Sequence, residues 1–68
     1  MEKVKITTEY IKLDQFLKYM GIAENGSHAK EIILAEDILV NGELEKRRGR
    51  KLYKNDVIEL NNAKFIIE

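Results

Sequence analysis

One segment carries most of the structural information in this chain: Ile38-Leu39-Val40-Asn41-Gly42-Glu43-Leu44-Glu45-Lys46-Arg47-Arg48-Gly49-Arg50-Lys51. Its first half predicts a β-hairpin, because a short β-branched run leads directly into Asn41-Gly42. Both turn residues tolerate the positive φ that a type I′ turn requires. On the return strand we expect Leu44 to face inward, and Glu43 and Glu45 to face outward.

A run of cations follows the predicted hairpin. Residues 46–51, here called the basic loop, hold five cations in six positions, and only Gly49 interrupts them. Most charge runs of this kind are solvated surface loops. The alternative is that a glycine-interrupted basic loop on a stiff hairpin bends around a curved polyanion. The segment alone leaves both interpretations open.

Length and composition predict one small domain, spanning residues 1–68, with a thin hydrophobic core. The chain has no Cys, which excludes disulfides and Cys-based zinc sites, and a single His is too few for a usual His-based metal site. We therefore expect no metal and no other cofactor. The N-terminus does not resemble a signal peptide, and no apolar run approaches membrane-spanning length. A cytoplasmic protein is expected.

The charges cancel in total but not locally. With 12 cations and 12 anions the chain is neutral, unlike most nucleic-acid-binding domains. Residues 46–54 nevertheless carry six cations and no acid, whereas residues 31–45 carry five acids and no base. A local patch attracts ligands through its own potential, so neutrality does not exclude a polyanionic partner.

The first helix is predicted over residues 13–20, followed by Gly21 as the residue that ends it. Lys12 lies at the start, where a cation opposes the helix dipole. It either completes an anion site with the first helical amides or is an ordinary surface lysine. The predicted core stripe has helical spacing and consists of Leu13, Phe16, Leu17 and Met20.

The second helix is predicted to begin after Asn25, a favourable N-cap, and to end near Glu36-Asp37. Gly26 and Ser27 would leave its first amides exposed. Ser27 next to His28 is not expected to be a nucleophile and base, because adjacent helical residues point about 100° apart. The predicted buried face consists of Ala29, Ile32 and Ile33.

The remaining segments predict strands over residues 1–8, 57–60 and 64–67, with a turn at Asn61-Asn62-Ala63. The order β-α-α-β-β-β-β gives an α+β domain, an αα-hairpin packed on a small twisted antiparallel sheet. We expect the first strand to join an edge of that sheet, beside the last strand.

Four short motifs in register resemble the S4 RNA-binding domain, named after the fourth protein of the small ribosomal subunit: Lys12-Leu13-Asp14, Ala29-Lys30, Val40-Asn41-Gly42 and Asn55-Asp56-Val57-Ile58. The resemblance covers about residues 10–60. Residues 47–52, together with residues 6–11, are also similar to the stand-alone YaaA-like branch of small bacterial proteins. The resemblance implies the αα-hairpin fold and the binding of structured RNA, with helix N-termini and the basic loop against phosphates.

Carried over by position, Lys12 replaces the usual Arg of the first helix, and Asn25-Gly26 replaces the usual Ser-Arg of the second. Gly26 thus lacks a main family cation, and the basic loop is expected to compensate. Glu36 and Asn55 stand where the family commonly has Gly, and Asn tolerates the left-handed conformation. The expected RNA-binding residues are Lys12, Asn25, Gly26, Ser27, Lys30, Lys46, Arg47, Arg48, Arg50 and Lys51.

The expected function is non-catalytic binding of helical or junction RNA, ribosomal RNA in particular, by a monomer without a small-molecule substrate. A-form RNA is read through phosphates and its shallow minor groove. Tyr10, Tyr19 and Tyr53 are scattered in the sequence, so no cluster for stacking bases is expected. No paired carboxylates, metal-ligand spacing or phosphate-binding glycine loop indicates an enzyme. The alternative is a protein-interaction module that binds a ribosomal protein or another acidic protein surface.

Overall fold

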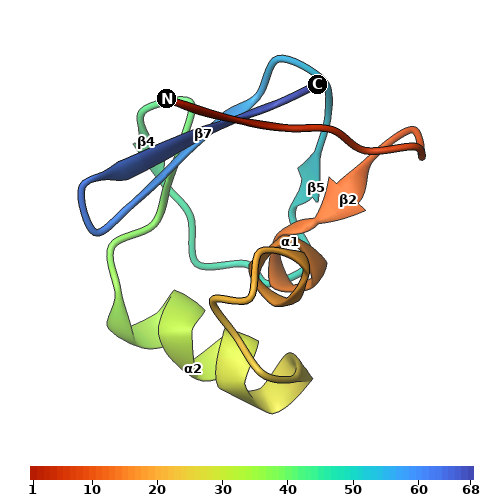
Figure 1. The fold of residues 1–68 in the computed structure, drawn as a ribbon. Coiled ribbons are helices and arrows are strands. Elements are labelled where there is room, and N and C mark those ends of the chain that lie inside the picture. The colour runs from red at the N-terminus through yellow and green to blue at the C-terminus, as the bar shows by residue number, and fades with distance from the viewer.

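The computed structural model describes residues 1–68 and has two helices on one side of a mixed sheet (Figure 1). In Figure 1 the helices lie below the strands, and both chain ends lie at the top. None of the helices has the length and apolar character needed to cross a membrane. The elements are β1 (Glu2–Val4), β2 (Ile11–Lys12), α1 (Leu13–Tyr19), α2 (Gly26–Ala35), β3 (Leu39–Val40), β4 (Glu43–Leu44), β5 (Lys51–Leu52), β6 (Val57–Leu60) and β7 (Ala63–Ile67).

The predicted α+β class is confirmed, as is the place of the first strand. Five strands form a sheet in the order β1-β7-β6-β3-β4, so β1 lies beside the last strand. The β1–β7 pairing is parallel, however, whereas the other pairings in this sheet are antiparallel. Parallel neighbours need a long connection between them, and both helices and five strands lie between β1 and β7 in the chain.

A second sheet was not predicted. It consists of β2 and β5, which pair antiparallel with Ile11 opposite Leu52 and Lys12 opposite Lys51. Leu52 ends β5, and a turn begins at Tyr53, whose carbonyl accepts a hydrogen bond from the amide of Asp56 at 3.0 Å. Two-residue strands are too short to show an alternating pattern, so the sequence offers no periodicity that would find them.

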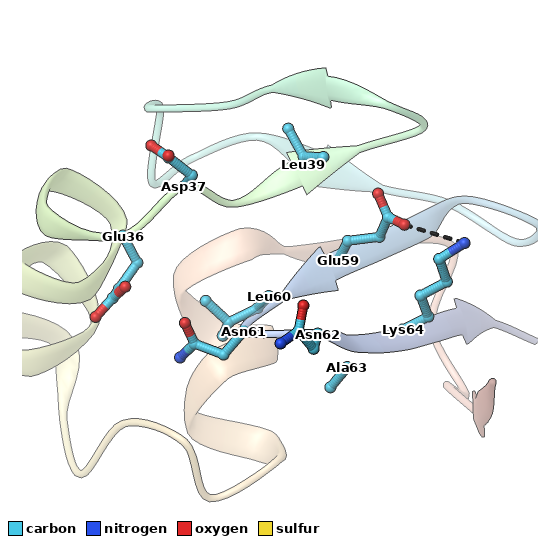
Figure 2. Close-up of a pocket in the computed structure, with 9 residues that line it drawn as sticks. All are labelled: Glu36, Asp37, Leu39, Glu59, Leu60, Asn61, Asn62, Ala63 and Lys64. Carbon is cyan, nitrogen blue, oxygen red and sulfur yellow. Dashed lines mark ion pairs between the residues drawn. The ribbon is translucent and has the colours of Figure 1, made fainter.

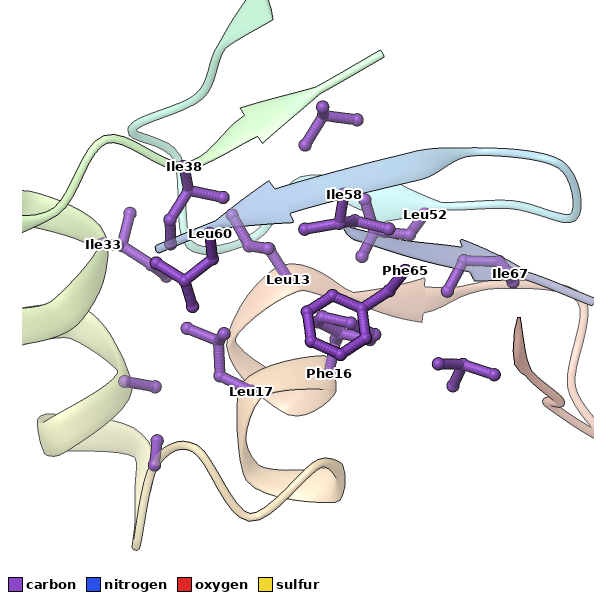
Figure 3. Close-up of a cluster of buried hydrophobic side chains, with 14 residues drawn as sticks. Leu13, Phe16, Leu17, Ile33, Ile38, Leu52, Ile58, Leu60, Phe65 and Ile67 are labelled. Carbon is purple, nitrogen blue, oxygen red and sulfur yellow. The ribbon is translucent and has the colours of Figure 1, made fainter. Parts of the chain in front are cut away.

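The core lies between the helices and the sheet (Figure 3). Leu13, Phe16 and Leu17 of α1 are fully buried, as their helical spacing predicted, and Met20 is partly buried. Phe16 meets Phe65 of β7 edge to face, with ring centroids 5.5 Å apart, which is a favourable aromatic geometry. The stripe on α1 therefore joins the helical layer to the sheet.

The predicted caps and turns are confirmed. Gly21 has a φ of 75° after α1, and Asn25 Oδ1 accepts a hydrogen bond from the His28 amide at 2.9 Å at the start of α2. Asn55 has a φ of 77°, which explains why it can stand where the family commonly has Gly. Glu36 has a φ of −103°, so its position does not require a glycine.

The expected orientation of the hairpin side chains was wrong. Leu44 pairs with Leu39 on the outer face of the sheet and is 56% exposed. Glu45 follows it, donates its amide to the Ile38 carbonyl at 2.8 Å, and is only 5% exposed. Directly opposed residues on neighbouring strands share a face of the sheet. Because Ile38 faces the core, Glu45 does so too. Glu43 lies opposite the buried Val40, on the same face of the sheet, but at the edge strand it is exposed.

Candidate nucleic-acid interface

The basic loop is docked on the first turn of α1. The amide of Leu13 donates to the Arg50 carbonyl at 2.8 Å, and the amide of Asp14 donates to the Arg48 carbonyl at 3.0 Å. These two helical amides are therefore occupied, and the hypothesis of an anion site built from them with Lys12 is wrong. What remains at this helix end is the exposed Lys12 side chain, on the strand that pairs with β5.

The buried carboxylate of Glu45 binds two arginines of the basic loop and so fixes the loop. Arg47 grips Glu45 in two places, with Nε on Oε2 and an Nη on Oε1, both at 3.0 Å, and its amide adds a third bond at 3.0 Å. Arg50 donates a fourth hydrogen bond to Oε1 at 2.8 Å. Two of the predicted phosphate-binding arginines are thus already engaged by an internal anion.

The arginines lower the pKa of Glu45 from its ordinary 4.5 to about 2. The hydrogen bond from the Arg47 side chain is the largest cause, and it outweighs the burial that opposes ionisation. The Arg47 amide and the Arg50 side chain lower the pKa further, as does the charge of Arg47. Glu45 therefore remains ionised at neutral pH, and its charge fixes both arginines.

Lys46 ties the start of the loop to the end of α2. Its Nζ lies within hydrogen-bond distance of three carbonyl oxygens, those of Ile33 at 3.2 Å, Leu34 at 3.3 Å and Glu36 at 2.9 Å. Asp37 is a further, loose partner at 3.9 Å. A cation at a helix C-terminus satisfies free carbonyls and complements the helix dipole. Lys46 therefore stabilises the fold at the end of α2.

Three other cations of this region stay open to solvent. Lys12 and Lys51 are exposed and face each other across the β2–β5 pair without a carboxylate partner. Arg48 has only a loose contact to Asp14, with Nε 3.9 Å from the carboxylate, and 55% of its side chain is exposed. Arg47 also keeps 74% of its side chain exposed despite its grip on Glu45. This face can bind a polyanion.

The start of α2 contains the other predicted site residues. Asn25 is used as the N-cap, and the amide of Glu24 donates to His28 Nδ1 at 3.1 Å, so His28 also serves the helix end. The amides of Gly26 and Ser27 have no partner in the protein, as predicted. Lys30 is exposed on the same helix. No hydrogen bond or ion pair joins these residues to the basic loop.

Two tyrosines that looked scattered are in fact neighbours. Tyr10 precedes β2 and Tyr53 follows β5, so both lie at the same end of this strand pair. Their ring centroids are 5.8 Å apart, with a tilt of 50° between the rings. Lys51 Nζ lies 4.8 Å from the centroid of the Tyr10 ring, in a cation–π contact. The expectation that no aromatic cluster exists was wrong, because it depended on sequence distance and the β2–β5 pairing was not foreseen.

A basic depression of about 570 Å³ opens beside this pair. Its lining combines cations with one aromatic ring and contains no acid: Arg47, Gly49, Arg50, Lys51 and Tyr53. Tyr53 is 43% exposed. The surface formed by the basic loop, the tyrosine pair and Lys12, whose strand pairs with β5, is here called the loop face.

A second depression, of about 510 Å³, has the opposite character (Figure 2). Of its four charged residues three are acidic, and the one cation, Lys64, pairs with Glu59 at 3.1 Å. The lining shares no residue with the loop face and consists of Glu36, Asp37, Leu39, Glu59, Leu60, Asn61, Asn62, Ala63 and Lys64.

Comparison with known proteins covers nearly the whole chain. The family model of the S4 domain matches residues 4–68. The chain is also 46% identical over 57 residues to the probable ribosome maturation protein RlbA of Bacillus subtilis (strain 168), in an alignment that covers 84% of this chain and 80% of that protein. The family match includes both helices, the basic loop and the sheet. The resemblance inferred from four short motifs is thereby confirmed, and the chain belongs to the S4 domain family.

Proposed function

We propose that this protein binds structured RNA, ribosomal RNA in particular, without catalysing a reaction, and that it does so as a single chain in the cytoplasm. One observation carries the proposal: the basic loop is docked on the first turn of α1, and this docking brings the exposed Arg48 and Lys51 next to Lys12. Arg47, whose side chain is 74% exposed, lines the same depression as Lys51. Membership of the S4 family supports an RNA target. The name of the relative, a ribosome maturation protein, supports a ribosomal one.

The geometry suits recognition of phosphates rather than of base sequence. Phosphate contacts fix the position and orientation of a protein on a helix and carry little sequence information. The hydrogen bonds of Glu45 with Arg47 and Arg50 fix the loop in the free protein, so RNA binding costs less conformational entropy. With roughly three phosphates engaged, affinity should fall by about tenfold or more between 50 and 200 mM salt.

The proposal is tested by titrating the protein with a naked ribosomal RNA helix at two salt concentrations. The informative variant is Lys12→Glu/Lys51→Glu, because neither lysine holds the fold through an ion pair. Reversing Arg47 or Arg50 is less informative, since it would release Glu45 and disturb the loop. The matched control is Lys5→Glu/Lys18→Glu, which changes the total charge equally at exposed positions outside the loop face.

We expect saturable, salt-sensitive binding by the wild type, loss of binding in the loop-face variant, and affinity within about threefold of the wild type in the control. Absence of binding to naked RNA by the wild type would overturn the proposal. An equal loss in the control would show that total charge, and not the loop face, is responsible.

The acidic depression favours a second candidate function, the binding of another protein. Its carboxylates, with Glu36 and Asp37 at the end of α2, suit a basic segment such as ribosomal proteins carry, rather than the acidic surface first considered. Binding to intact ribosomal subunits that survives nuclease treatment, and that Glu36→Lys/Asp37→Lys abolishes, would favour this function. Binding lost with the RNA would exclude it as the main one.

A further inference from the structure

Tyr53 offers an unused aromatic surface next to the cations of the loop face. Tyr53 is 43% exposed, although its ring is large, and it lines the basic depression together with Arg47, Arg50 and Lys51. No hydrogen bond within the protein uses its hydroxyl group. Phosphate contacts alone would not need an aromatic ring here.

The ring is held in place from two sides. Tyr10 supports it at a centroid distance of 5.8 Å, and Lys51 in turn lies against Tyr10. The Tyr53 amide donates to Asp56 Oδ2 at 2.8 Å, and Asp56 Oδ1 accepts from Asn41 Nδ2 at 3.0 Å. The backbone that carries the ring is thus anchored to the β3–β4 hairpin, and a ring fixed in this way loses little freedom when a ligand stacks on it.

The lining has the two halves that a nucleotide needs. Arginine and lysine side chains provide donors for a phosphate, and the tyrosine ring provides a flat surface for a base. The depression contains no acidic residue, and its volume of about 570 Å³ falls within the range of small-ligand sites. A paired base inside an RNA helix has no free face to offer, whereas a base in a bulge or junction does.

We propose that this depression receives an unpaired nucleotide of the bound RNA, with its base stacked on Tyr53 and its phosphate held by Arg47 and Lys51. The inference rests on the proposed function and adds to it a preference for helices interrupted by a bulge or junction. Tyr53 is the residue that distinguishes such RNA from a continuous helix, while the phosphate contacts of Lys12 and Arg48 are common to both.

The test uses the full chain and two RNAs, a continuous ribosomal RNA helix and the same helix with one bulged 2-aminopurine nucleotide. The variants are Tyr53→Leu, which removes the ring, and Tyr53→Phe, which keeps it. Tyr19→Leu is the matched control, because Tyr19 is 63% exposed outside the loop face. Affinity and 2-aminopurine fluorescence are measured at low and high salt.

We expect the wild type to bind the bulged RNA about tenfold more tightly and to quench its fluorescence, since stacking on an aromatic ring contributes roughly this much per base. Tyr53→Phe and the Tyr19→Leu control should keep both effects. Tyr53→Leu should lose both while binding the continuous helix as the wild type does. Raising the salt should lower both affinities without abolishing the preference for the bulged RNA, because stacking is not a charge interaction.

Three outcomes would overturn the inference. If the wild type binds the two RNAs with equal affinity and does not quench the fluorescence, the nucleotide site is contradicted, while the proposed RNA binding still stands. A preference that Tyr53→Leu retains places the base elsewhere. Binding of neither RNA overturns the proposed function together with this site. Tyr53 lies outside the buried core, so circular dichroism should show Tyr53→Leu to be folded.

Discussion

Two groups of cations in and next to the basic loop have different roles. The inner group, Lys46, Arg47 and Arg50, is bound to the protein itself, through the carbonyls at the end of α2 and the buried Glu45. Arg47 is the member of this group that also keeps most of its side chain, 74%, exposed to a ligand. The outer group, Lys12, Arg48 and Lys51, has at most a loose carboxylate contact at 3.9 Å. A run of like charges in a sequence is therefore not by itself a binding surface. Part of it can be the support that holds the rest in place.

The difference also explains how a neutral chain can have a basic face. Glu45 is counted among the 12 acids, yet it lies beneath the loop, where it is only 5% exposed. Other acids, such as Glu36 and Asp37, gather at the second depression. The total charge is zero because the 12 cations and 12 anions cancel, but the two signs are separated in space, and a partner responds to the local potential.

The strongest test of the inner group is Glu45→Gln, which removes the charge and keeps the shape. We expect the free energy of unfolding to fall by about 2–3 kcal/mol, because the buried carboxylate loses its charge and two arginines lose their anion. Chemical denaturation at pH 7 measures it. Glu43→Gln, an exposed neighbour on β4, should change stability by less than about 0.5 kcal/mol. Equal effects of the two variants would mean that Glu45 is not the anchor.

Lowering the pH should likewise reduce the contribution of Glu45 to the free energy of unfolding. The pKa of Glu45 is lowered from 4.5 to about 2 in the folded state, so its contribution is complete above pH 4.5 and is lost as the pH falls toward 2. Over that range the wild type should lose about 2 kcal/mol more unfolding free energy than Glu45→Gln does. Denaturation curves at several pH values measure the difference. Parallel curves for the two proteins would contradict the role given to this carboxylate.

For the outer group the sharpest test is Lys12→Gln/Lys51→Gln. We expect RNA affinity to fall about tenfold, or about 1.4 kcal/mol, and the slope of affinity against salt to become shallower by about 2, one for each lost phosphate contact. Stability should stay within about 0.5 kcal/mol. Salt-dependent titration and denaturation measure the two effects. A loss of stability with unchanged RNA affinity would place these lysines in the inner group.

The smallest expected effect is that of Lys46→Met, the converse of the previous variant. Three carbonyls at the end of α2 lose their cationic donor, so the free energy of unfolding should fall by about 1 kcal/mol. RNA affinity should stay within about twofold, because Lys46 does not belong to the outer group. Lys54→Met, at an exposed position, is the stability control. A tenfold loss of RNA affinity without loss of stability would show that Lys46 binds phosphate directly.

The sequence predicted the elements better than it predicted the site. Asn41-Gly42, Gly21 and Asn25 marked a turn and two helix ends correctly, because positive φ and N-capping are properties of a few neighbouring residues. The motifs that carry the family resemblance are structural in the same way. Asn41 and Asp56, for example, hydrogen bond to each other and join the hairpin to the following turn. Such motifs identify the fold without showing which cations are free.

One error could have been avoided from the sequence. A two-residue turn at Asn41-Gly42 places residue 38 opposite residue 45, so a buried Ile38 requires an inward Glu45. The hydrophobicity of Leu44 was given more weight than this register. The tyrosine pair had no comparable signal, because Tyr10 and Tyr53 meet only through the two-residue strands β2 and β5.

The sequence by itself determined the α+β class, both helices with their caps, the hairpin turn and the family. These depend on contacts within one turn of chain or on a face with regular spacing. Only the tertiary structure decided that Glu45 anchors Arg47 and Arg50, that Lys46 binds the carbonyls at the end of α2, and that Tyr53 lines a basic depression. The physical reason is that a charge becomes structural or free according to which buried groups lie next to it, and strand pairing and helix docking set those neighbours.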